Sequence, residues 1–261
     1  VIADHWKSLE LIKTSKKKYC LIHGKEINHP KGSIQNKRVL NVLDNVEKII
    51  ANSEFTKNLA VEIANVGGNF YELPELEFIQ QNLESSNPVI IDIGANTGNH
   101  LVYFAKIIHA AKVIPIEFHP EIIATLEKHI SINQVSNIDL SKLGYAIDQN
   151  RGTSFIKEHP AKDLSLTEIA DNIINGIEVV VVTLDELIKE KVDFIKVDVQ
   201  GAEIKALTGA KNLISIYQPD MLVEVTKSHM KDFRKFLETV KYKSVKAFDH
   251  GRYVNFYIKH T

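Results

Sequence analysis

Residues 89–100 read Val89-Ile-Ile-Asp-Ile-Gly-Ala-Asn-Thr-Gly-Asn-His100, and this stretch decides the fold. An apolar run that carries an acid leads into a tight turn between Gly94 and Gly98, and a helical pattern begins at Leu101. A strand, a glycine turn and a helix in this order are typical of a nucleotide-type cofactor site, where the helix N-terminus faces an anionic group. The third glycine of G-x-G-x-x-G is absent, so the turn favours a smaller anion than pyrophosphate, such as the carboxylate of S-adenosylmethionine (SAM).

Strand and helix patterns alternate after this stretch. Buried or alternating apolar runs predict strands at 89–93, 113–116, 138–143, 178–182, 194–199, 221–225, 244–248 and 254–258. Helical spacing predicts helices at 99–109, 120–132, 161–174, 202–213 and 231–240. Alternation of this kind predicts an α/β fold with a mostly parallel sheet and helices on both faces. Asp249-His250-Gly251-Arg252 reads as the turn of a C-terminal antiparallel hairpin.

The chain before residue 85 has a different pattern. Apolar residues at helical spacing over 38–65 predict a helix, Gly67-Gly68 interrupts it, and a second helix is expected from about Pro74 to Leu83. We therefore expect an N-terminal, partly helical extension over residues 1–84 and a main domain over residues 85–261. Tyr71 and Glu72 are close enough in sequence to the glycine turn to reach it.

Composition excludes several classes of protein. The 261 residues are 44% hydrophobic and 25% charged with a net charge of −1, which indicates a globular domain and not a strongly basic nucleic-acid binder. Cys20 is the single cysteine, so no internal disulfide forms, and a reducing, cytoplasmic location is expected. No apolar run approaches the roughly 20 residues that span a bilayer.

Acidic residues lie at the ends of four predicted strands, where a parallel sheet places its ligands. These residues are Asp92, Glu117, Asp198 and Glu224. Glu117 follows Asp92 by 25 residues, close to the roughly 20 expected for an acid that binds ribose hydroxyls. Its alternative role is that of an acid near the N-terminus of the following helix. Asp92 either accepts hydrogen bonds from its own turn or contacts the ammonium of the cofactor.

Five motifs in fixed order make the chain resemble the FkbM-type SAM-dependent methyltransferases, within the class I methyltransferase superfamily. The resemblance covers about residues 70–225. The motifs are Asp92-Ile-Gly-Ala-Asn-Thr-Gly98, Ile116-Glu-Phe-His-Pro120, Thr183-Leu-Asp-Glu-Leu187, Asp193-Phe-Ile-Lys-Val-Asp-Val-Gln-Gly-Ala-Glu203 and Leu207-Thr-Gly-Ala210.

The resemblance implies a Rossmann-like sheet of seven strands and methyl transfer from SAM to a hydroxyl of a sugar, a glycan or a small natural product. By position, Glu117 is the ribose ligand, and Ala146 lies near the adenine. The methionine-side loop is implied to contain Asp92, Gly94, Asn96 and Gly98. The chain departs from the family pattern at two places: Gln200 stands where the family has Glu, and Phe118-His119-Pro120 stands where it has Pro-Asn-Pro.

A hydroxyl acceptor must lose its proton as it attacks the methyl group. Asp198 is the leading candidate for the acceptor-side acid, and Glu224 and His229 follow it. The alternative for Asp198 is a buried acid that is bonded to Lys196 or to backbone. Glu203 is a further candidate, although an acid in the first turn of a helix also favours the helix dipole. Asp198 and Glu224 together would suit a divalent cation, but no dense ligand motif supports one, so no metal is predicted.

Three other classes of function remain open at this point. A catalytically silent SAM-binding or scaffolding domain is the main alternative, because Gln200 departs from the family pattern. A Rossmann oxidoreductase is disfavoured by the missing third glycine. A nucleic-acid methyltransferase is disfavoured by the near-neutral charge and by Gln200-Gly201 after the strand at 194, where a Pro-Pro-Tyr-type turn would be expected.

Overall fold

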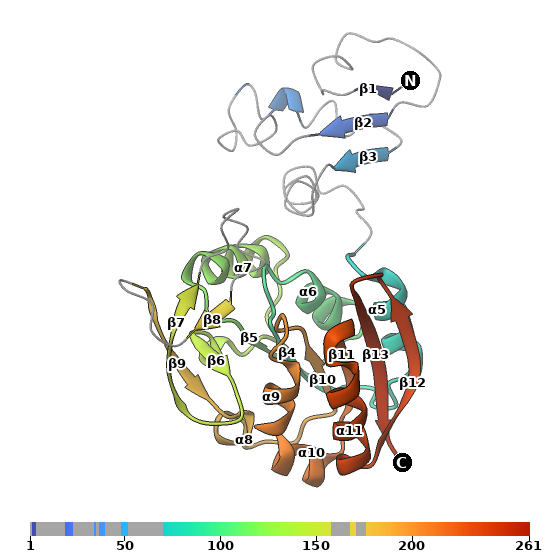
Figure 1. The fold of residues 1–261 in the computed structure, drawn as a ribbon. Helices are drawn as coiled ribbons and strands as arrows, with labels where there is room; N and C mark the ends of the chain where they lie inside the picture. The colour runs from blue at the N-terminus through green and yellow to red at the C-terminus, as the bar shows by residue number, and fades with distance from the viewer. Residues whose placement is uncertain are drawn as a thin grey trace. The chain divides into compact units, whose positions relative to one another are not determined.

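The computed structural model describes residues 2–3, 19–22, 34, 37–39, 48–51, 70–157, 168–170 and 176–261. The chain forms two compact units, Val1–Asn69 and Phe70–Thr261. The first unit contains a parallel sheet of β1 (Ile2–Ala3), β2 (Tyr19–Ile22) and β3 (Lys48–Ala51) (Figure 1). The helix expected over 38–65 is therefore wrong at Lys48–Ala51, where strand pairing with β2 prevails over the helical spacing. Most of that range lies outside the described residues.

The second unit begins before the expected boundary at residues 84 and 85. It includes α5 (Leu73–Asn82), the helix expected near Pro74, which packs its buried Leu76 and Ile79 into the core. This helix belongs to the second unit because its apolar side chains share one cluster with the central sheet.

A six-stranded sheet in the order β12-β13-β11-β10-β4-β5 forms the centre of the second unit (Figure 1). Its strands are β4 (Val89–Ile93), β5 (Lys112–Ile116), β10 (Phe194–Val197), β11 (Asp220–Thr226), β12 (Tyr242–Asp249) and β13 (Tyr253–His260). Strands β5, β4, β10 and β11 run parallel, and β13 pairs antiparallel with both β11 and β12. The predicted C-terminal hairpin is confirmed.

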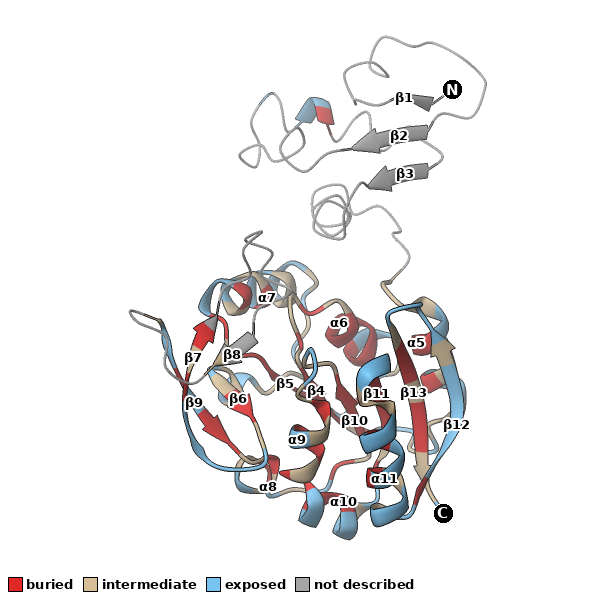
Figure 2. Cartoon of the chain, viewed as in Figure 1, coloured by how far each residue is buried: buried red, intermediate tan, exposed pale blue. Residues whose placement is uncertain are grey.

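Helices cover both faces of this sheet, as the alternation predicts. The helices of the second unit also include α6 (Asn99–Lys106), α7 (Pro120–Ile132), α8 (Leu184–Leu187), α9 (Glu203–Thr208), α10 (Lys211–Tyr217) and α11 (Met230–Val240). One core cluster joins the sheet to α8, α9, α10 and α11, and another joins it to α5 and α6. The strands between them are mostly buried, whereas the outer faces of the helices are exposed (Figure 2).

The two core clusters follow the alternation of side chains along the strands. Ile91 and Ile93 belong to the first cluster, and Ile90 belongs to the second. Because successive side chains of a strand point to opposite faces, Asp92 shares the face of Ile90. Residues at the carboxyl ends of the strands that share this face are therefore brought together beside α5 and α6.

Two predicted elements are corrected. In place of a strand at 138–143, Ile138 makes a single parallel bridge to Val113 and Leu140–Lys142 form a 3-10 helix. The central sheet consequently has six strands, one fewer than the resemblance implies. In place of a helix over 161–174, Glu168–Ala170 form β8, whose partner strand β7 (Gly152–Lys157) supplies backbone hydrogen bonds that a helix would forgo. The rest of that range lies outside the described residues.

A second sheet in the order β6-β9-β7-β8 is formed by β7, β8, β6 (Tyr145–Ile147) and β9 (Glu178–Val182). It begins next to the end of β5, where the amide of Gly144 donates to the carbonyl of Glu117 over 2.8 Å. Among the described helices, none is long and apolar enough to cross a bilayer.

Candidate active site

The glycine turn follows β4 and brings β4 against the end of β10. Gly94 has a φ of 75°, and a Cβ built on it would lie 1.8 Å from the backbone oxygen of Asp198. Glycine is therefore required at this position by space as well as by conformation. Gly98 has a φ of 85° and is the N-cap residue of α6, whose first turn continues the loop. The turn leads into a helix N-terminus, which is the arrangement that suits a carboxylate.

Glu117 lies at the end of β5, and its carboxylate is fixed by the glycine turn. Its Oε2 accepts a hydrogen bond from the amide of Asn96 over 3.1 Å, and its Oε1 accepts from the amides of Phe118 at 2.8 Å and His119 at 3.0 Å. Burial raises the pKa of Glu117, and these three hydrogen bonds oppose that shift. A carboxylate has about four acceptor sites, so Oε2 keeps a lone pair for a further donor.

Ala146 lies in β6, close to the residue that follows Glu117. It is buried in a small cluster with Val179 and Val181, and Phe118 packs against that cluster. An apolar surface thus adjoins the Glu117 carboxylate, as a site for a nucleoside requires: polar contacts for the sugar and an apolar surface for the base.

His119 takes over a structural role at one departure from the family pattern. Its Nδ1 accepts a hydrogen bond from the amide of Glu121 over 3.2 Å and so caps the N-terminus of α7. Asparagine side chains cap helices in the same way. The change from Asn to His at this position therefore preserves the cap that orients α7 after Glu117.

A buried lysine, Lys196, lies between two of the predicted acids. Its Nζ is 3.3 Å from Oδ1 of Asp92 and 3.3 Å from Oδ2 of Asp198. Burial alone would lower the pKa of Lys196, but the charges of Asp92 and Asp198 raise it above its ordinary value. Asp92 is fully buried, so its ionised form depends on this ammonium.

Glu224 lies on β11 in a region of concentrated negative charge. Burial first, and then the charges of Asp198 and Glu72, raise the pKa of Glu224 to about 8. Glu72 precedes α5, and its Oε1 accepts from Nδ2 of Asn255, the cross-strand partner of Glu224 on β13. The structure thus brings Asp198 and Glu224 into one electrostatic group and adds Glu72 to it.

Tyrosine hydroxyls from both ends of the second unit meet next to this group. The hydroxyls of Tyr71 and Tyr253 are hydrogen-bonded at 2.7 Å. The amide of Tyr71 donates to Oδ1 of Asn99, which fixes Tyr71 to the start of α6. Burial raises the pKa of Tyr71 to about 12, and the charges of Asp198 and Glu224 add to that shift. Tyr71 and Glu72 do reach the motif block, as expected from the sequence.

Glu203 and His229 form a further contact after β10. Oε1 of Glu203 accepts from the amide of Gly201 over 2.5 Å, and Oε2 lies 3.9 Å from Nδ1 of His229. His229 also hydrogen-bonds Thr226 through Nδ1 at 3.0 Å, and 40% of its side chain is exposed. Glu203 therefore orders the Gln200–Gly201 turn, in which Gln200 itself is exposed.

Comparison with known proteins agrees with this geometry. A family model described as the methyltransferase FkbM domain matches residues 92–249, from the acid of β4 to the end of β12. The chain belongs to the FkbM methyltransferase family. The match includes Glu117, Lys196, Asp198, Glu224 and His229.

A solved structure of an FkbM methyltransferase shows the same fold at low sequence identity. The FkbM methyltransferase from Methylobacillus flagellatus KT has a TM-score of 0.50 and 14% identity, over 92% of this chain and 73% of that one. A ribosomal protein L11 methylase from Lactobacillus delbrueckii subsp. bulgaricus has a TM-score of 0.48 and 11% identity, over 92% and 94% of the two chains. The chain therefore has the fold of the FkbM methyltransferase from Methylobacillus flagellatus KT. No match was found among curated proteins.

The motif Thr183-Leu-Asp-Glu-Leu187 of this FkbM-family chain has a structural role in holding two helices together. Thr183 and Glu186 form a capping box at the start of α8. The carboxylate of Asp185 accepts from the amides of Asn212 at 3.0 Å and Leu213 at 2.8 Å, which joins α8 to α10. Thr183-Leu-Asp-Glu-Leu187 therefore fixes the helix layer beneath the sheet.

The sequence analysis did not place Tyr253 or Asn255 in the site, and it gave Lys196 only as an alternative partner of Asp198. A signal for Lys196 was present, because it lies two residues from Asp198 and strand side chains at i and i+2 share a face. Tyr253 and Asn255 gave no comparable signal. They reach the site only because β13 pairs with β11, which places Asn255 opposite Glu224.

Proposed function

We propose that this methyltransferase uses SAM to methylate a hydroxyl of a sugar, a glycan or a small natural product. The observation that carries the proposal is the position of the Glu117 carboxylate. It is hydrogen-bonded to the glycine turn and keeps an acceptor site, so a ribose hydroxyl and a methionine carboxylate can be bound by adjacent parts of one loop.

The residues present fit SAM. Gly94, Asn96 and Gly98 form the loop for its methionine part, and Glu117 accepts from the ribose. Ala146 and Phe118 offer an apolar surface for the adenine. Asp92 lies beneath the loop, where its ion pair with Lys196 makes a structural role the main one. Bound SAM supplies a methyl group on a positively charged sulfur, which is already activated for displacement.

We infer that Glu224 accepts the proton of the acceptor hydroxyl. A general base is most effective when its pKa lies near the working pH, and the raised pKa of Glu224 meets this condition. The neighbouring Asp198 is held by Lys196 over 3.3 Å, which leaves its other oxygen to bind and orient the hydroxyl. His229 is the third candidate, since its imidazole is bonded to Thr226 and partly exposed.

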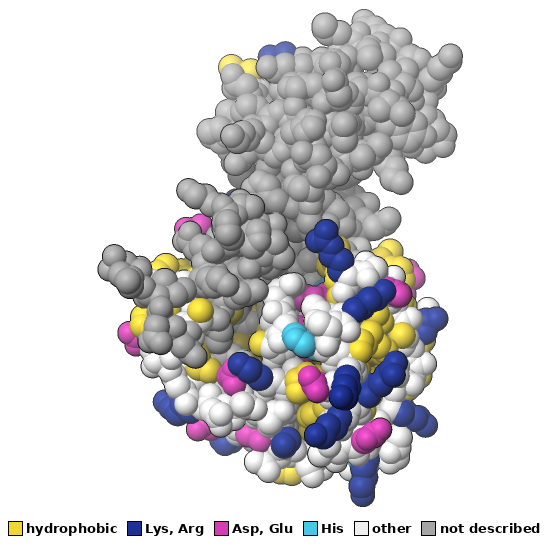
Figure 3. All heavy atoms as spheres, in the orientation of Figure 1, with side chains coloured by type: hydrophobic (Ala, Val, Ile, Leu, Met, Phe, Trp, Pro, Cys, Tyr) yellow, Lys and Arg dark blue, Asp and Glu magenta, His cyan; other side chains and the backbone are white. Residues whose placement is uncertain are grey.

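The net charge of −1 favours a small or carbohydrate acceptor over nucleic acid. Figure 3 shows Lys and Arg side chains over α11, with acidic and hydrophobic side chains between them. A nucleic-acid site would instead present a continuous basic stripe. The carboxylates and tyrosine hydroxyls around Asp198 match an acceptor that carries several hydroxyls.

The test is a transfer assay with the purified chain, tritiated SAM and a cell extract as the source of acceptors. Label should enter a small-molecule or glycan fraction that resists nuclease and protease. Label in a nuclease-sensitive fraction would replace this proposal by a nucleic-acid methyltransferase. SAM binding by calorimetry without any transfer of label would instead support the catalytically silent domain.

Three substitutions separate binding from chemistry. Glu117→Gln should weaken SAM binding by at least about tenfold, since one charge-assisted acceptor is lost. Asp198→Asn and Glu224→Gln should leave SAM affinity unchanged and lower turnover by at least about tenfold. Glu238→Gln, on the exposed face of α11, is the matched control for the last variant. Full turnover in Asp198→Asn and Glu224→Gln would refute these assignments.

A further inference from the structure

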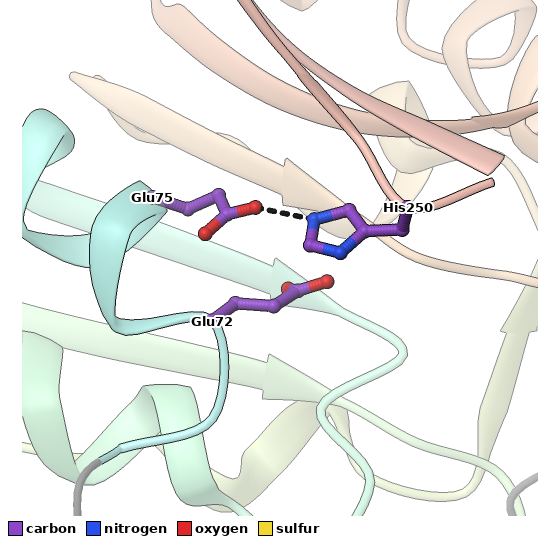
Figure 4. Close-up of side chains that lie close together, drawn as sticks. All are labelled: Glu72, Glu75 and His250. Carbon is purple, nitrogen blue, oxygen red and sulfur yellow. Dashed lines mark hydrogen bonds and ion pairs between the residues drawn. The ribbon is translucent and has the colours of Figure 1, made fainter.

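A second group of ligating side chains lies where α5 meets the C-terminal hairpin, and we call it the Glu–Glu–His cluster: Glu72, Glu75 and His250. Glu72 and Glu75 come from the start of α5, and His250 comes from the turn between β12 and β13 (Figure 4). One carboxylate oxygen of each glutamate and one ring nitrogen of His250 all lie within 4.8 Å of one another. The three side chains point into the same small space (Figure 4).

Glu75 has an unsatisfied oxygen in this space. The residue is 1% exposed, and its Oε1 is hydrogen-bonded to Nε2 of His250 at 2.6 Å. Its Oε2 is buried and has no hydrogen-bond partner among the described residues. A buried carboxylate oxygen without a hydrogen-bond donor destabilises the folded state, and such unpaired oxygens are rare in native proteins. A positive ligand at this point would satisfy it.

The other polar groups do not supply that ligand. Nδ2 of Asn255 donates to Oε1 of Glu72 at 2.7 Å and lies 3.5 Å from Oε1 of Glu75. Nε2 of His100 lies 3.5 Å from Oε2 of Glu72 and 3.1 Å from the carbonyl of Tyr71. Among the described residues, the only ion pairs of Glu72 and Glu75 are with His100 and His250. Two buried carboxylates thus have only imidazoles as ion-pair partners among the described residues.

We propose that the Glu–Glu–His cluster binds one divalent transition-metal ion, with zinc as the best match. Two carboxylate oxygens and one imidazole nitrogen are ligands that Zn²⁺ accepts, and three protein ligands leave a fourth position for water. An imidazole ligand favours Zn²⁺ over Mg²⁺, which prefers oxygen. The ion replaces the proton between His250 and Glu75 and links α5 to the hairpin turn 175 residues away in sequence.

The required rearrangement is small. Ligand atoms about 2.0 Å from a tetrahedral zinc ion lie about 3.3 Å apart, whereas Nε2 of His250 and Oε1 of Glu75 are 2.6 Å apart. Nε2 of His250 and Oε1 of Glu75 therefore have to separate by less than an ångström, whereas ligand atoms as far apart as 4.8 Å have to approach one another. His250 lies in an exposed turn and 33% of its side chain is exposed, so the turn can move while Glu72 and Glu75 stay with α5.

The test is titration calorimetry of the full chain, treated with chelator and then dialysed, against ZnCl₂ and MgCl₂. The wild-type chain should bind about one Zn²⁺ and show no heat with MgCl₂. His250→Ala should lower the zinc affinity by at least about tenfold. His109→Ala, which removes an exposed histidine elsewhere, should bind as the wild type does. Circular dichroism checks that each variant is folded.

A second measurement tests whether the buried Glu75 is a metal ligand. Cobalt(II) in place of zinc should give visible d–d absorption in the wild type that is lost in Glu75→Gln and in His250→Ala. The absence of zinc binding in the wild type, or a zinc affinity of folded His250→Ala equal to that of the wild type, would overturn the proposal. The contact between His250 and Glu75 would then be an ordinary hydrogen bond. The zinc titrations use no SAM, so this outcome and that of the SAM assay are independent.

Discussion

The ammonium of Lys196 lies 3.3 Å from the carboxylate of Asp92, and the two residues are direct cross-strand partners on β10 and β4. Asp92 is fully buried and Lys196 is 4% exposed. The Asp92 charge is therefore acceptable in the core only because Lys196 is present, whereas the ammonium of Lys196 also pairs with Asp198 at 3.3 Å. The pair stands directly beneath Gly94, whose carbonyl is 3.4 Å from the same ammonium, so it couples core stability to the shape of the glycine turn.

Lys196→Met should destabilise the chain by about 3–5 kcal/mol, because it leaves the Asp92 carboxylate buried without its partner. Urea unfolding followed by circular dichroism measures the loss. Lys205→Met is the control: Nζ of Lys205 lies 3.6 Å from Asp148, but 60% of its side chain is exposed. Its loss should be about 0–1 kcal/mol. Asp92→Asn in the Lys196→Met background should recover part of the stability, and equal losses in the two lysine variants would contradict the role of burial.

Gly94→Ala should abolish SAM binding, because the new methyl group would push the Asp198 carbonyl and separate β4 from β10. Gly251→Ala is a matched control, since Gly251 has a φ of 84° and nothing lies within 4 Å of its Cβ position. That control isolates the conformational cost, about 1 kcal/mol. Calorimetry with SAM and urea unfolding compare the two variants. A Gly94→Ala chain that binds SAM as tightly as Gly251→Ala would show that the close approach is dispensable.

Glu224 makes stability depend on pH in a defined direction. Its pKa is raised from 4.5 to about 8 in the folded chain, so the folded state holds a proton that the unfolded state has lost between these values. The free energy of unfolding contributed by Glu224 is therefore greatest below about pH 4.5 and falls as the pH rises to about 8. Urea unfolding at several pH values should show a flatter profile for Glu224→Gln than for the wild type. Parallel profiles would refute the shift, and Glu238→Gln should keep the wild-type slope.

His119→Ala should lower stability by about 0.5–2 kcal/mol through loss of the α7 cap, with some further loss from the cavity. His119→Asn should retain most of the stability, because its side-chain oxygen can accept from the Glu121 amide in the same way. Thermal unfolding of the three chains makes the comparison. The capping role would be wrong if Asn were no better than Ala at this position.

The sequence alone determined the parallel core of the fold and the edge of the sheet at which Asp92, Glu117, Asp198 and Glu224 lie. Short β-branched or apolar runs that end near glycines or acids predict β4, β5, β10 and β11. These strands can be recognised from sequence because the pattern of apolar residues and the turn residues that end it lie within a few positions of one another. The position of Glu117 beside the glycine turn also follows from the sequence, since both belong to one strand–helix–strand unit. The prediction failed at Glu168–Ala170 and Lys48–Ala51, where a short apolar run fits helix and strand equally and a partner strand decides.

Tertiary structure alone decided which polar groups meet around Asp198 and Glu224 and in the Glu–Glu–His cluster. Asn255 faces Glu224, and His250 contacts Glu75, because β13 folds back antiparallel beside β11 while α5 packs over the same end of the sheet. These pairs are separated by between 31 and 175 residues, and no local pattern encodes such a meeting. Their energies depend on burial and on neighbouring charge, and both exist only after the chain has folded.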